Sequence, residues 1–222
     1  MDLKEAMKLR HSVRSYKDKE IEPNIRKELN ILAEKCSHES GLNIQIFYNE
    51  PKAFSGMMTH YGKFSNVKNY IALVGKKGKN LEEKCGYYGE QLVLKAQQLG
   101  LNTCWVAMTY SKGKTPCTIE KGEKLCCVIA LGYGETQGVS HNAKPIEKLC
   151  NIRGNMPDWF KKGMEAAQLA PTAMNQQKFL ITLNKDDTVT FKALAGFYTK
   201  LDLGIVKYHF NIGADKTSTF EK

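Results

Sequence analysis

The chain has 222 residues, of which 42% are hydrophobic and 25% charged, so it can bury one sizeable core or two small ones. It holds no apolar run of about 18 residues and begins without the apolar core of a signal peptide, so we expect a cytoplasmic protein that does not enter a membrane. The net charge of +10 is diffuse and comes with no nucleic-acid-binding signature, which favours a solvated basic surface suited to small anions over a nucleic-acid partner.

The seven cysteines do not indicate a disulfide framework or a metal site. They stand at positions 36, 85, 104, 117, 126, 127 and 150, an odd number without a C-x-x-C pair. We therefore predict no metal. Cys104, Cys126 and Cys127 lie in apolar surroundings and are expected to be reduced core residues.

The first part of the chain alternates helices and short strands. Helices are predicted over residues 2–10, 23–36, 53–61 and 81–99, because Pro23 suits a helix start and Gly100 a helix end. Strands are predicted over residues 43–48, 70–74, 104–107 and 125–132. The run 70–74 is nearly all apolar, which is typical of a strand covered on both faces.

A polar loop over residues 134–143 leads to the remaining elements. These are a helix over 157–169, a hairpin of strands 179–183 and 189–191, and a last helix over 201–212. Together the elements predict an α+β fold.

The segment Arg10-His11-Ser12-Val13-Arg14-Ser15-Tyr16, here called the arginine segment, has the chemistry of an anion site. Guanidinium groups present planar forks of donors that match phosphate oxygens, and Ser12 adds a hydroxyl. In an extended chain Arg10, Ser12 and Arg14 point to one face. The alternative is that they are surface residues that follow an amphipathic helix.

Three stretches resemble motifs of the FMN-dependent nitroreductase family. The arginine segment resembles its R-R/H-S-x-R/K-x-F/Y signature, residues 99–105 (LGLNTCW) its L-G-L-G-T-x-W helix exit, and residues 170–177 (APTAMNQQ), here called the APT segment, its A-P-S/T-x-x-N-x-Q-P-W stretch. The resemblance implies the nitroreductase fold, an antiparallel or mixed sheet flanked by helices. It also implies FMN as cofactor.

The order of the motifs resembles a smaller branch of that family, built from two unequal repeats. The APT segment stands near the C-terminus, whereas in most members it follows the arginine motif by a few tens of residues. Asn43 and Gln45 echo Asn175 and Gln177 at one constant offset. We expect a first repeat over residues 1–143 and a second over 144–222, related like the subunits of a dimer within one integrated unit. Two unrelated helix–strand units are the alternative.

Such a chain is a pseudo-dimeric monomer with one complete FMN site, and a further homodimer is left open. The resemblance places Arg10, His11 and Ser12 at the FMN phosphate. It places Arg14 near the pyrimidine edge of the ring, where a fixed positive charge favours hydride acceptance. No side chain is expected to act as nucleophile or general base, because the flavin carries the chemistry.

The remaining cofactor contacts are also implied by the resemblance. Ala107 and Met108 offer a backbone N–H to flavin N5, and Lys144 stands near a further phosphate ligand of the family, although the commoner arginine position holds Ala143. Pro171 and Thr172 contact the ring edge, and Asn175 and Gln177 hold the turn or reach the ligand. Asn175 could equally be a turn residue that bonds its own backbone.

The predicted function is hydride transfer from NADH or NADPH to nitroaromatics, quinones or similar flat small molecules. Another flavin reaction on the same fold, such as dehalogenation or flavin breakdown, is one alternative. A non-catalytic flavin-binding or nucleic-acid-associated basic protein is the other. Four residues are candidates either for the walls of a substrate slot or for packing or surface positions: His60, Tyr61, Phe64 and Tyr110. His209 is expected in the core or at an interface.

Overall fold

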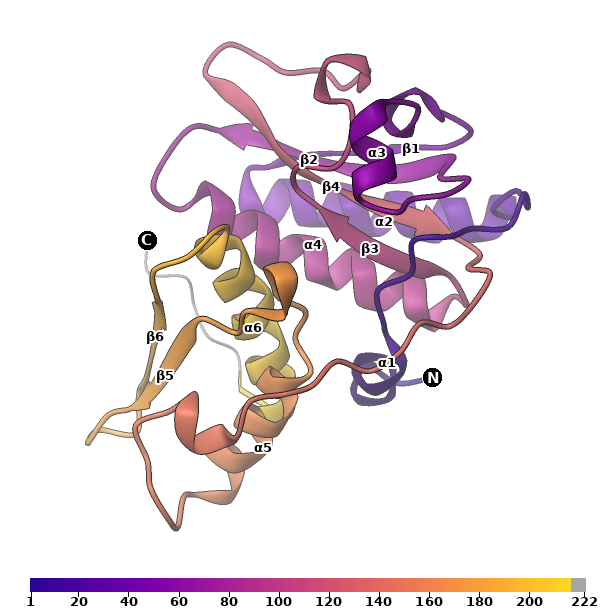
Figure 1. The fold of residues 1–222 in the computed structure, drawn as a ribbon. Helices are drawn as coiled ribbons and strands as arrows, with labels where there is room; N and C mark the ends of the chain where they lie inside the picture. Colours follow the sequence, from indigo (N-terminus) through magenta and orange to yellow (C-terminus); the bar gives the residue numbers. More distant parts are fainter. Residues whose placement is uncertain (217–222) are drawn as a thin grey trace. The chain divides into compact units, whose positions relative to one another are not determined.

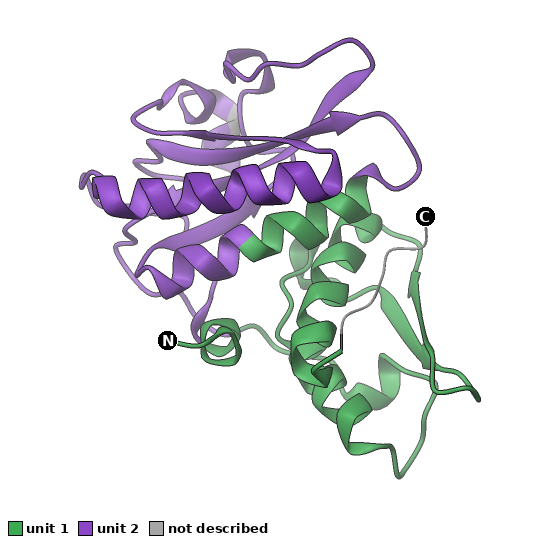
Figure 2. Ribbon diagram, turned by 180° about the vertical axis from the view of Figure 1, so that it is seen from behind, with its two compact units in different colours: residues 1–8, 82–91, 141–222 green, residues 9–81, 92–140 purple. Residues whose placement is uncertain are grey.

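The computed structural model describes residues 1–216 and divides the chain into two compact units (Figure 2). The sheet unit comprises residues 9–81 and 92–140. The hairpin unit comprises residues 1–8, 82–91 and the described residues from 141 onward. Helix α4, Leu81–Gln98, contributes turns to both units. The duplication predicted from the sequence, with its boundary between residues 143 and 144, stays a prediction.

The sheet unit is built on a four-stranded antiparallel sheet in the order β1-β2-β4-β3 (Figure 1). Its strands are β1 (Asn43–Phe47), β2 (Asn69–Lys76), β3 (Asn102–Val106) and β4 (Glu123–Gly132). Ile71 of β2 pairs with Ile129 of β4, and Cys104 of β3 pairs with Ala130. Around the sheet lie α2 (Pro23–Ser40), α3 (Met57–Tyr61) and the short helices η1 (Lys52–Phe54) and η2 (Lys112–Lys114).

Strand β2 is covered on both faces, as its apolar run predicted. All its residues except Lys76 are buried. Tyr70, Ala72 and Val74 point into a core cluster that also contains Phe54 and Phe64. Helix α2 packs on β1 and ends at Gly41, whose φ of 70° is the left-handed conformation that glycine adopts without strain.

The hairpin unit joins helices α1 (Leu3–Leu9), α5 (Asp158–Gln168) and α6 (Thr199–Ala214) to the hairpin of β5 (Phe179–Leu183) and β6 (Val189–Ala193). Short helices η3 (Ile146–Lys148) and η4 (Ala173–Asn175) lie in its connections. Phe160 of α5 and Phe191 of β6 pack edge-on against Phe210 of α6, with ring centroids 5.5 and 5.3 Å apart. Aromatic contacts therefore join both sides of α6 to the rest of the unit.

The α+β class and the nature of each major element are confirmed, and one helix differs. The helix expected over 53–61 is broken into η1 and α3, with Ser55 and Gly56 between them, and Gly56 passes so close to the Ser111 side chain that a Cβ there would collide with it. Helix α2 also continues to Ser40, four residues beyond its expected end.

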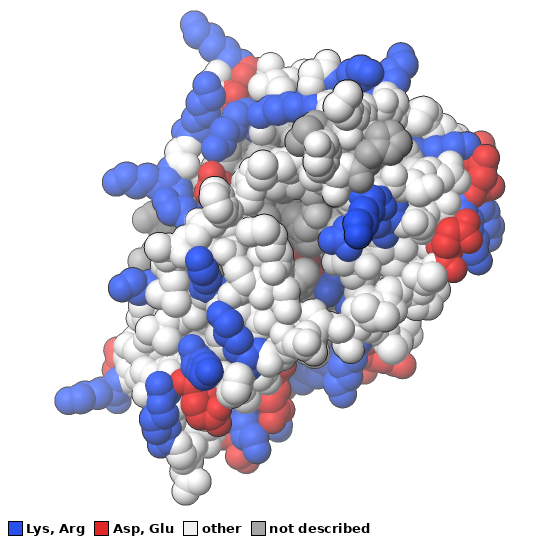
Figure 3. Space-filling view, viewed as in Figure 1, with Lys and Arg blue, Asp and Glu red and all other residues white. Residues whose placement is uncertain are grey.

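All seven cysteines are free; Cys104 and Cys127 are buried as expected, whereas Cys126 is only partly buried. Among residues 1–216, no helix combines the length and the apolar character that a bilayer crossing requires. Lysines and arginines are spread among acidic residues over the face shown in Figure 3.

Two glycines allow α4 and α6 to cross in close contact within the hairpin unit. A Cβ on Gly204 of α6 would collide with the Glu83 carbonyl oxygen, and a Cβ on Gly86 of α4 would collide with the Leu201 carbonyl oxygen. Because backbone atoms cannot move aside as a flexible side chain does, both positions require glycine.

We expect Gly204→Ala to lower the free energy of unfolding by about 1–3 kcal/mol, since the helices must separate to admit the methyl group. Urea denaturation followed by circular dichroism measures the change. Gly113→Ala is the control, because a Cβ there meets nothing within 4 Å. Equal stability of the two variants would show that the crossing tolerates a methyl group.

Candidate functional site

The arginine segment lies in the sheet unit, where β3 and two loops hold it extended. Ser12 pairs with Thr103 of β3 as an isolated parallel bridge, and the Val13 amide donates to the Thr103 carbonyl oxygen at 3.0 Å. Further along, the Ser65 amide donates to the Arg14 carbonyl oxygen at 2.9 Å. An extended chain sends alternate side chains to the same face, so this backbone pairing selects which side chains converge.

Arg10, Ser12 and Arg14 all act on the thiol of Cys104, a buried residue of β3. Burial raises the pKa of the Cys104 thiol, whereas the Arg14 charge, a hydrogen bond with Ser12 and the Arg10 charge each act to lower it. The charges of two guanidinium groups and a hydroxyl thus reach one buried thiol. The arrangement has the donors of a site for a small anion.

The two guanidinium groups differ in exposure. Arg10 is buried, with 3% of its surface exposed, whereas Arg14 is exposed and its Cζ lies 6.0 Å from the centroid of the Phe64 ring. His11 is partly buried, and a Cβ placed on Gly138 would lie 2.8 Å from the Cβ of His11. The loop after β4 therefore passes directly beside His11.

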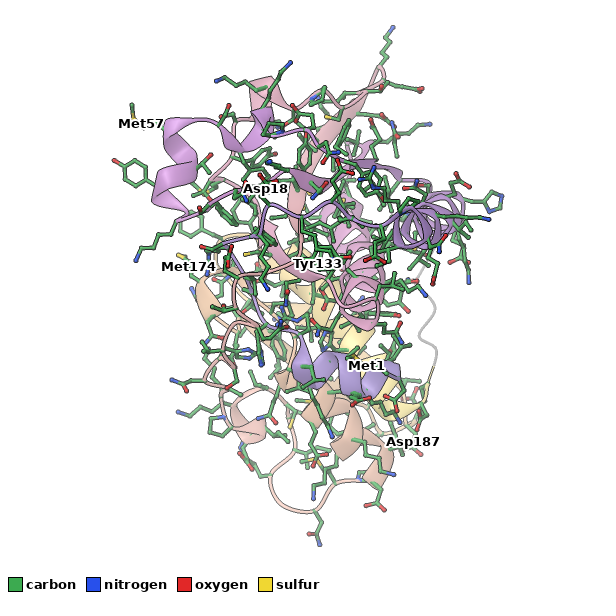
Figure 4. All side chains as sticks on the ribbon, turned by 90° about the vertical axis from the view of Figure 1, so that its right-hand side faces the viewer. Met1, Asp18, Met57, Tyr133, Met174 and Asp187 are labelled. Carbon is green, nitrogen blue, oxygen red and sulfur yellow. The ribbon has the colours of Figure 1, made fainter. Side chains whose placement is uncertain are left out.

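Of the other predicted residues of the sheet unit, some are exposed and others are buried in the core. Ala107 and Met108 directly follow β3, and Met108 is 61% exposed. Tyr61 is also exposed, and Met57 projects outward from α3 (Figure 4).

Phe64 and Tyr110 are buried in the core cluster against Phe54, so of the two alternatives for them the packing role is confirmed. The side chain of His60 lies outside what the structure describes.

The APT segment belongs to the hairpin unit and has an uncommon backbone. Met174, Asn175 and Gln177 have φ values of 51°, 53° and 45°, in the left-handed region that costs residues other than glycine roughly 1–3 kcal/mol each. Met174 is 81% exposed, and Figure 4 shows its side chain directed away from the ribbon. Such a conformation persists only where surrounding contacts enforce it.

One set of these contacts links the end of the APT segment to residues 142–144. The buried Gln177 side chain accepts from the Lys144 amide at 2.7 Å and donates to the Asn142 carbonyl oxygen at 2.8 Å. The Lys144 ammonium donates to the carbonyl oxygens of Gln176 and Gln177, at 2.7 and 3.1 Å. Asn175 donates to the Asn142 carbonyl oxygen at 3.0 Å. These side chains hold the turn, and the predicted role of Lys144 as a phosphate ligand stays a prediction.

The other set of contacts comes from Asp202, in the first turn of α6. One carboxylate oxygen accepts from the Ala173 amide at 2.9 Å, and the other accepts from the Gln176 side-chain amide at 2.8 Å. Burial raises the pKa of Asp202 to about 6, although both hydrogen bonds act to lower it. Pro171 and Thr172 are partly buried at the start of the segment, and the Thr172 hydroxyl oxygen accepts from the Gln177 amide at 3.0 Å.

Sequence reasoning missed two residues of these clusters. Cys104 was expected only as a core residue, and Asp202 was not singled out. A single acid between Leu201 and Leu203 is a signal that could have identified Asp202, because buried acids need hydrogen-bond donors.

His209, the residue expected in a core or interface, is fully buried in the hairpin unit. Its Nε2 lies 2.9 Å from a carboxylate oxygen of Glu90, which is also fully buried, and its Nδ1 lies 3.2 Å from the Ala166 carbonyl oxygen. Both ring nitrogens therefore have a hydrogen-bonding partner inside the unit. The pair joins α4, α5 and α6, and a structural role accounts for it.

A family model described as "Putative TM nitroreductase" matches residues 2–214. No curated protein is similar enough to count as a match. Among solved structures, a protein described as a "putative nitroreductase" from Thermotoga maritima MSB8 has a TM-score of 0.69 and 22% identity. The match covers 96% of this chain and 83% of that one.

Two further structures show the same fold at lower similarity. An FMN-dependent nitroreductase from Clostridium difficile R20291 has a TM-score of 0.52 and 18% identity, covering 68% of this chain and 98% of that one. A nitroreductase from Desulfovibrio desulfuricans, solved in complex with FMN, has a TM-score of 0.54 and 14% identity, covering 71% of this chain and 99% of that one.

Tyr16 makes a hydrogen bond that closes the arginine segment on itself. Its hydroxyl, in a residue only 3% exposed, donates to the Val13 carbonyl oxygen at 2.7 Å. We expect Tyr16→Phe to lower the free energy of unfolding by about 1–2 kcal/mol, because a buried carbonyl loses its donor. Urea denaturation measures the effect, with Tyr61→Phe as the control because Tyr61 is 78% exposed. If the two variants lose the same amount, the bond contributes nothing specific.

Proposed function

Because the chain belongs to the nitroreductase family whose model it matches over residues 2–214, we propose that it is an FMN-dependent oxidoreductase. It takes hydride from NADH or NADPH and passes it to nitroaromatics, quinones or similar flat acceptors. The observation that carries the proposal is that Arg10, Ser12 and Arg14 lie on an extended segment paired with β3 and all act on one buried thiol, Cys104.

The residues present fit the phosphate of FMN. A phosphate dianion needs fixed positive charge and several donors, and two guanidinium groups beside a hydroxyl supply both. The titratable acids at this point, the Cys104 thiol and the Tyr16 hydroxyl, both have a pKa raised by burial and so add no negative charge at neutral pH. The charge balance therefore favours an anion.

The residues have distinct proposed roles. Buried Arg10, with Ser12 and His11, binds the phosphate, and exposed Arg14 holds positive charge where the pyrimidine edge of the ring is expected. The backbone amides of Ala107 and Met108 orient the ring at N5. FMN itself, when bound, accepts and donates the hydride, so these residues bind and orient and none of them acts as acid or base.

The APT segment supplies the remaining proposed contacts with the flavin. Pro171 and Thr172 contact the edge of the ring, and Asn175 and Gln177 keep the segment in its left-handed conformation. Lys144 supports the same segment and, through its remaining N–H, is proposed to reach the phosphate.

The first measurement is an absorbance spectrum of the purified protein, incubated with FMN and desalted. We expect flavin bands that bleach when NADH or NADPH is added under nitrogen and return when a quinone or nitroaromatic follows. The same titration with either nucleotide alone measures donor preference. A protein that stays colourless would contradict the proposed function outright.

Substitution of the arginines tests their roles separately. Hydrogen bonds to charged groups are worth about 1.5–3 kcal/mol, so Arg10→Ala should raise the FMN dissociation constant about 10- to 100-fold. Arg14→Ala should weaken binding and also slow flavin reduction in stopped-flow experiments at saturating FMN. Arg153→Ala, which removes the same charge outside the proposed site, is the control. Unchanged reduction kinetics in Arg14→Ala would remove its electrostatic role.

The FMN content of the saturated protein tests the proposal that one chain supplies one complete site. We expect one FMN per chain, measured by flavin absorbance after denaturation against protein concentration from amino-acid analysis. Size-exclusion chromatography with light scattering gives the oligomeric state alongside. A content near two per chain would overturn the single-site arrangement.

A further inference from the structure

The strained APT segment is held by the buried carboxylate of Asp202. Both hydrogen bonds that this carboxylate accepts are at full strength only while it is ionised. Asp202 lies in α6, outside every motif discussed above, and it is 3% exposed. Its two carboxylate oxygens each accept one hydrogen bond from the APT segment, from the Ala173 amide and from the Gln176 side chain. Both partners are donors, so both contacts need acceptors.

We propose that Asp202 is the positioning residue of the APT segment, holding it in its left-handed conformation while ionised and releasing it on protonation. The functional consequence, weaker flavin contact in the protonated state, rests on the proposed function. The structural part concerns residues of the hairpin unit alone.

Hydrogen-bond chemistry explains why ionisation matters. A carboxylate has two strong acceptor oxygens, whereas in a carboxylic acid one of them becomes an O–H that donates and accepts only weakly. On protonation, either Ala173 or Gln176 therefore faces another donor and loses its hydrogen bond. The freed contact lies beside Met174 and Asn175, the first residues with positive φ.

The Gln176 amide cannot simply turn over to repair the contact. Its nitrogen donates to the Phe197 carbonyl oxygen at 2.6 Å as well as to Asp202 at 2.8 Å. A reversed amide would place its oxygen against the Phe197 carbonyl oxygen, and two acceptors repel. An asparagine at position 202 has the same one acceptor and one donor group as the protonated acid and therefore imitates it permanently.

The effect of Asp202 on the stability of the fold depends on pH in the opposite direction from its effect on the order of the APT segment. Besides burial, two groups act on the Asp202 carboxyl, the Ala173 amide and the Gln176 side-chain amide, and neither is charged. Burial raises its pKa from 3.8 to about 6, so between these values the folded state binds more protons than the unfolded state. The contribution of Asp202 to stability falls as pH rises through this window, while the APT segment becomes more ordered.

Because the stability of the fold and the order of the APT segment respond to pH in opposite directions, measuring both distinguishes a positioning role of Asp202 from a merely structural one. We expect Asp202→Asn to have a melting temperature at about pH 7.5 that is not below that of the wild type, because a buried charge is removed. Whichever group faces the donor of the asparagine, the Ala173 amide or the Gln176 side-chain amide, should nevertheless lose about tenfold in its hydrogen-exchange protection factor. Asp158→Asn is the matched control, since Asp158 is an exposed acid in the first turn of α5.

The experiment measures hydrogen exchange at Ala173 and Gln176 by NMR on the FMN-free protein at about pH 5 and about pH 7.5, together with FMN affinity by fluorescence. In the wild type, protection and affinity should both fall at the lower pH. In Asp202→Asn both should be low and independent of pH. Wild-type protection in the variant at pH 7.5, or a persisting pH dependence, would overturn the proposal.

A second variant covers the case in which Asp202→Asn does not fold. Gln176→Ala removes a hydrogen bond that lowers the pKa of Asp202, so the midpoint of the protection change at Ala173 should move to higher pH. An unmoved midpoint would contradict the proposal. Absence of FMN binding at every pH would refute the proposed function alone, because the exchange measurements would still decide the role of Asp202.

Discussion

The extended course of the arginine segment beside β3 is the constraint on which the candidate site depends. One parallel bridge, between Ser12 and Thr103, fixes the register. Because side chains alternate along an extended chain, this register sends Arg10, Ser12 and Arg14 toward Cys104. A shift of one residue would turn all of them to the opposite face. The chemistry of the site therefore rests on a backbone contact.

The APT segment is positioned at a substantial cost in stability. Each left-handed residue other than glycine costs roughly 1–3 kcal/mol, and the raised pKa of Asp202 corresponds to roughly 3 kcal/mol against its ionised form. Apolar packing with an ordinary turn would avoid both costs. Strain held in place by a buried charge is instead characteristic of a segment whose conformation is needed for function. This agrees with the segment's resemblance to a flavin-contacting motif.

The sequence predicted the features that depend on local signals and missed those that depend on contacts between distant segments. Pro23, Gly100 and the apolar run at 70–74 were enough to place α2, α4 and β2. The break between η1 and α3 was not predicted, and the approach of Gly56 to Ser111 at this place is a contact between distant segments that local signals do not show. The arginine segment was recognisable because its residues are adjacent in sequence. The role of Asp202 was not, since its partners Ala173 and Gln176 precede it by many residues and its burial cannot be read from composition.

The two groups of residues differ in how firmly their charge is fixed. A guanidinium group stays protonated at any pH that a folded protein tolerates, so the anion site formed by Arg10 and Arg14 keeps its positive charge. Asp202, in contrast, changes charge at about pH 6, within reach of ordinary solution conditions. A change of pH near this value therefore acts on the contacts of the APT segment and leaves the charge of the guanidinium groups unchanged.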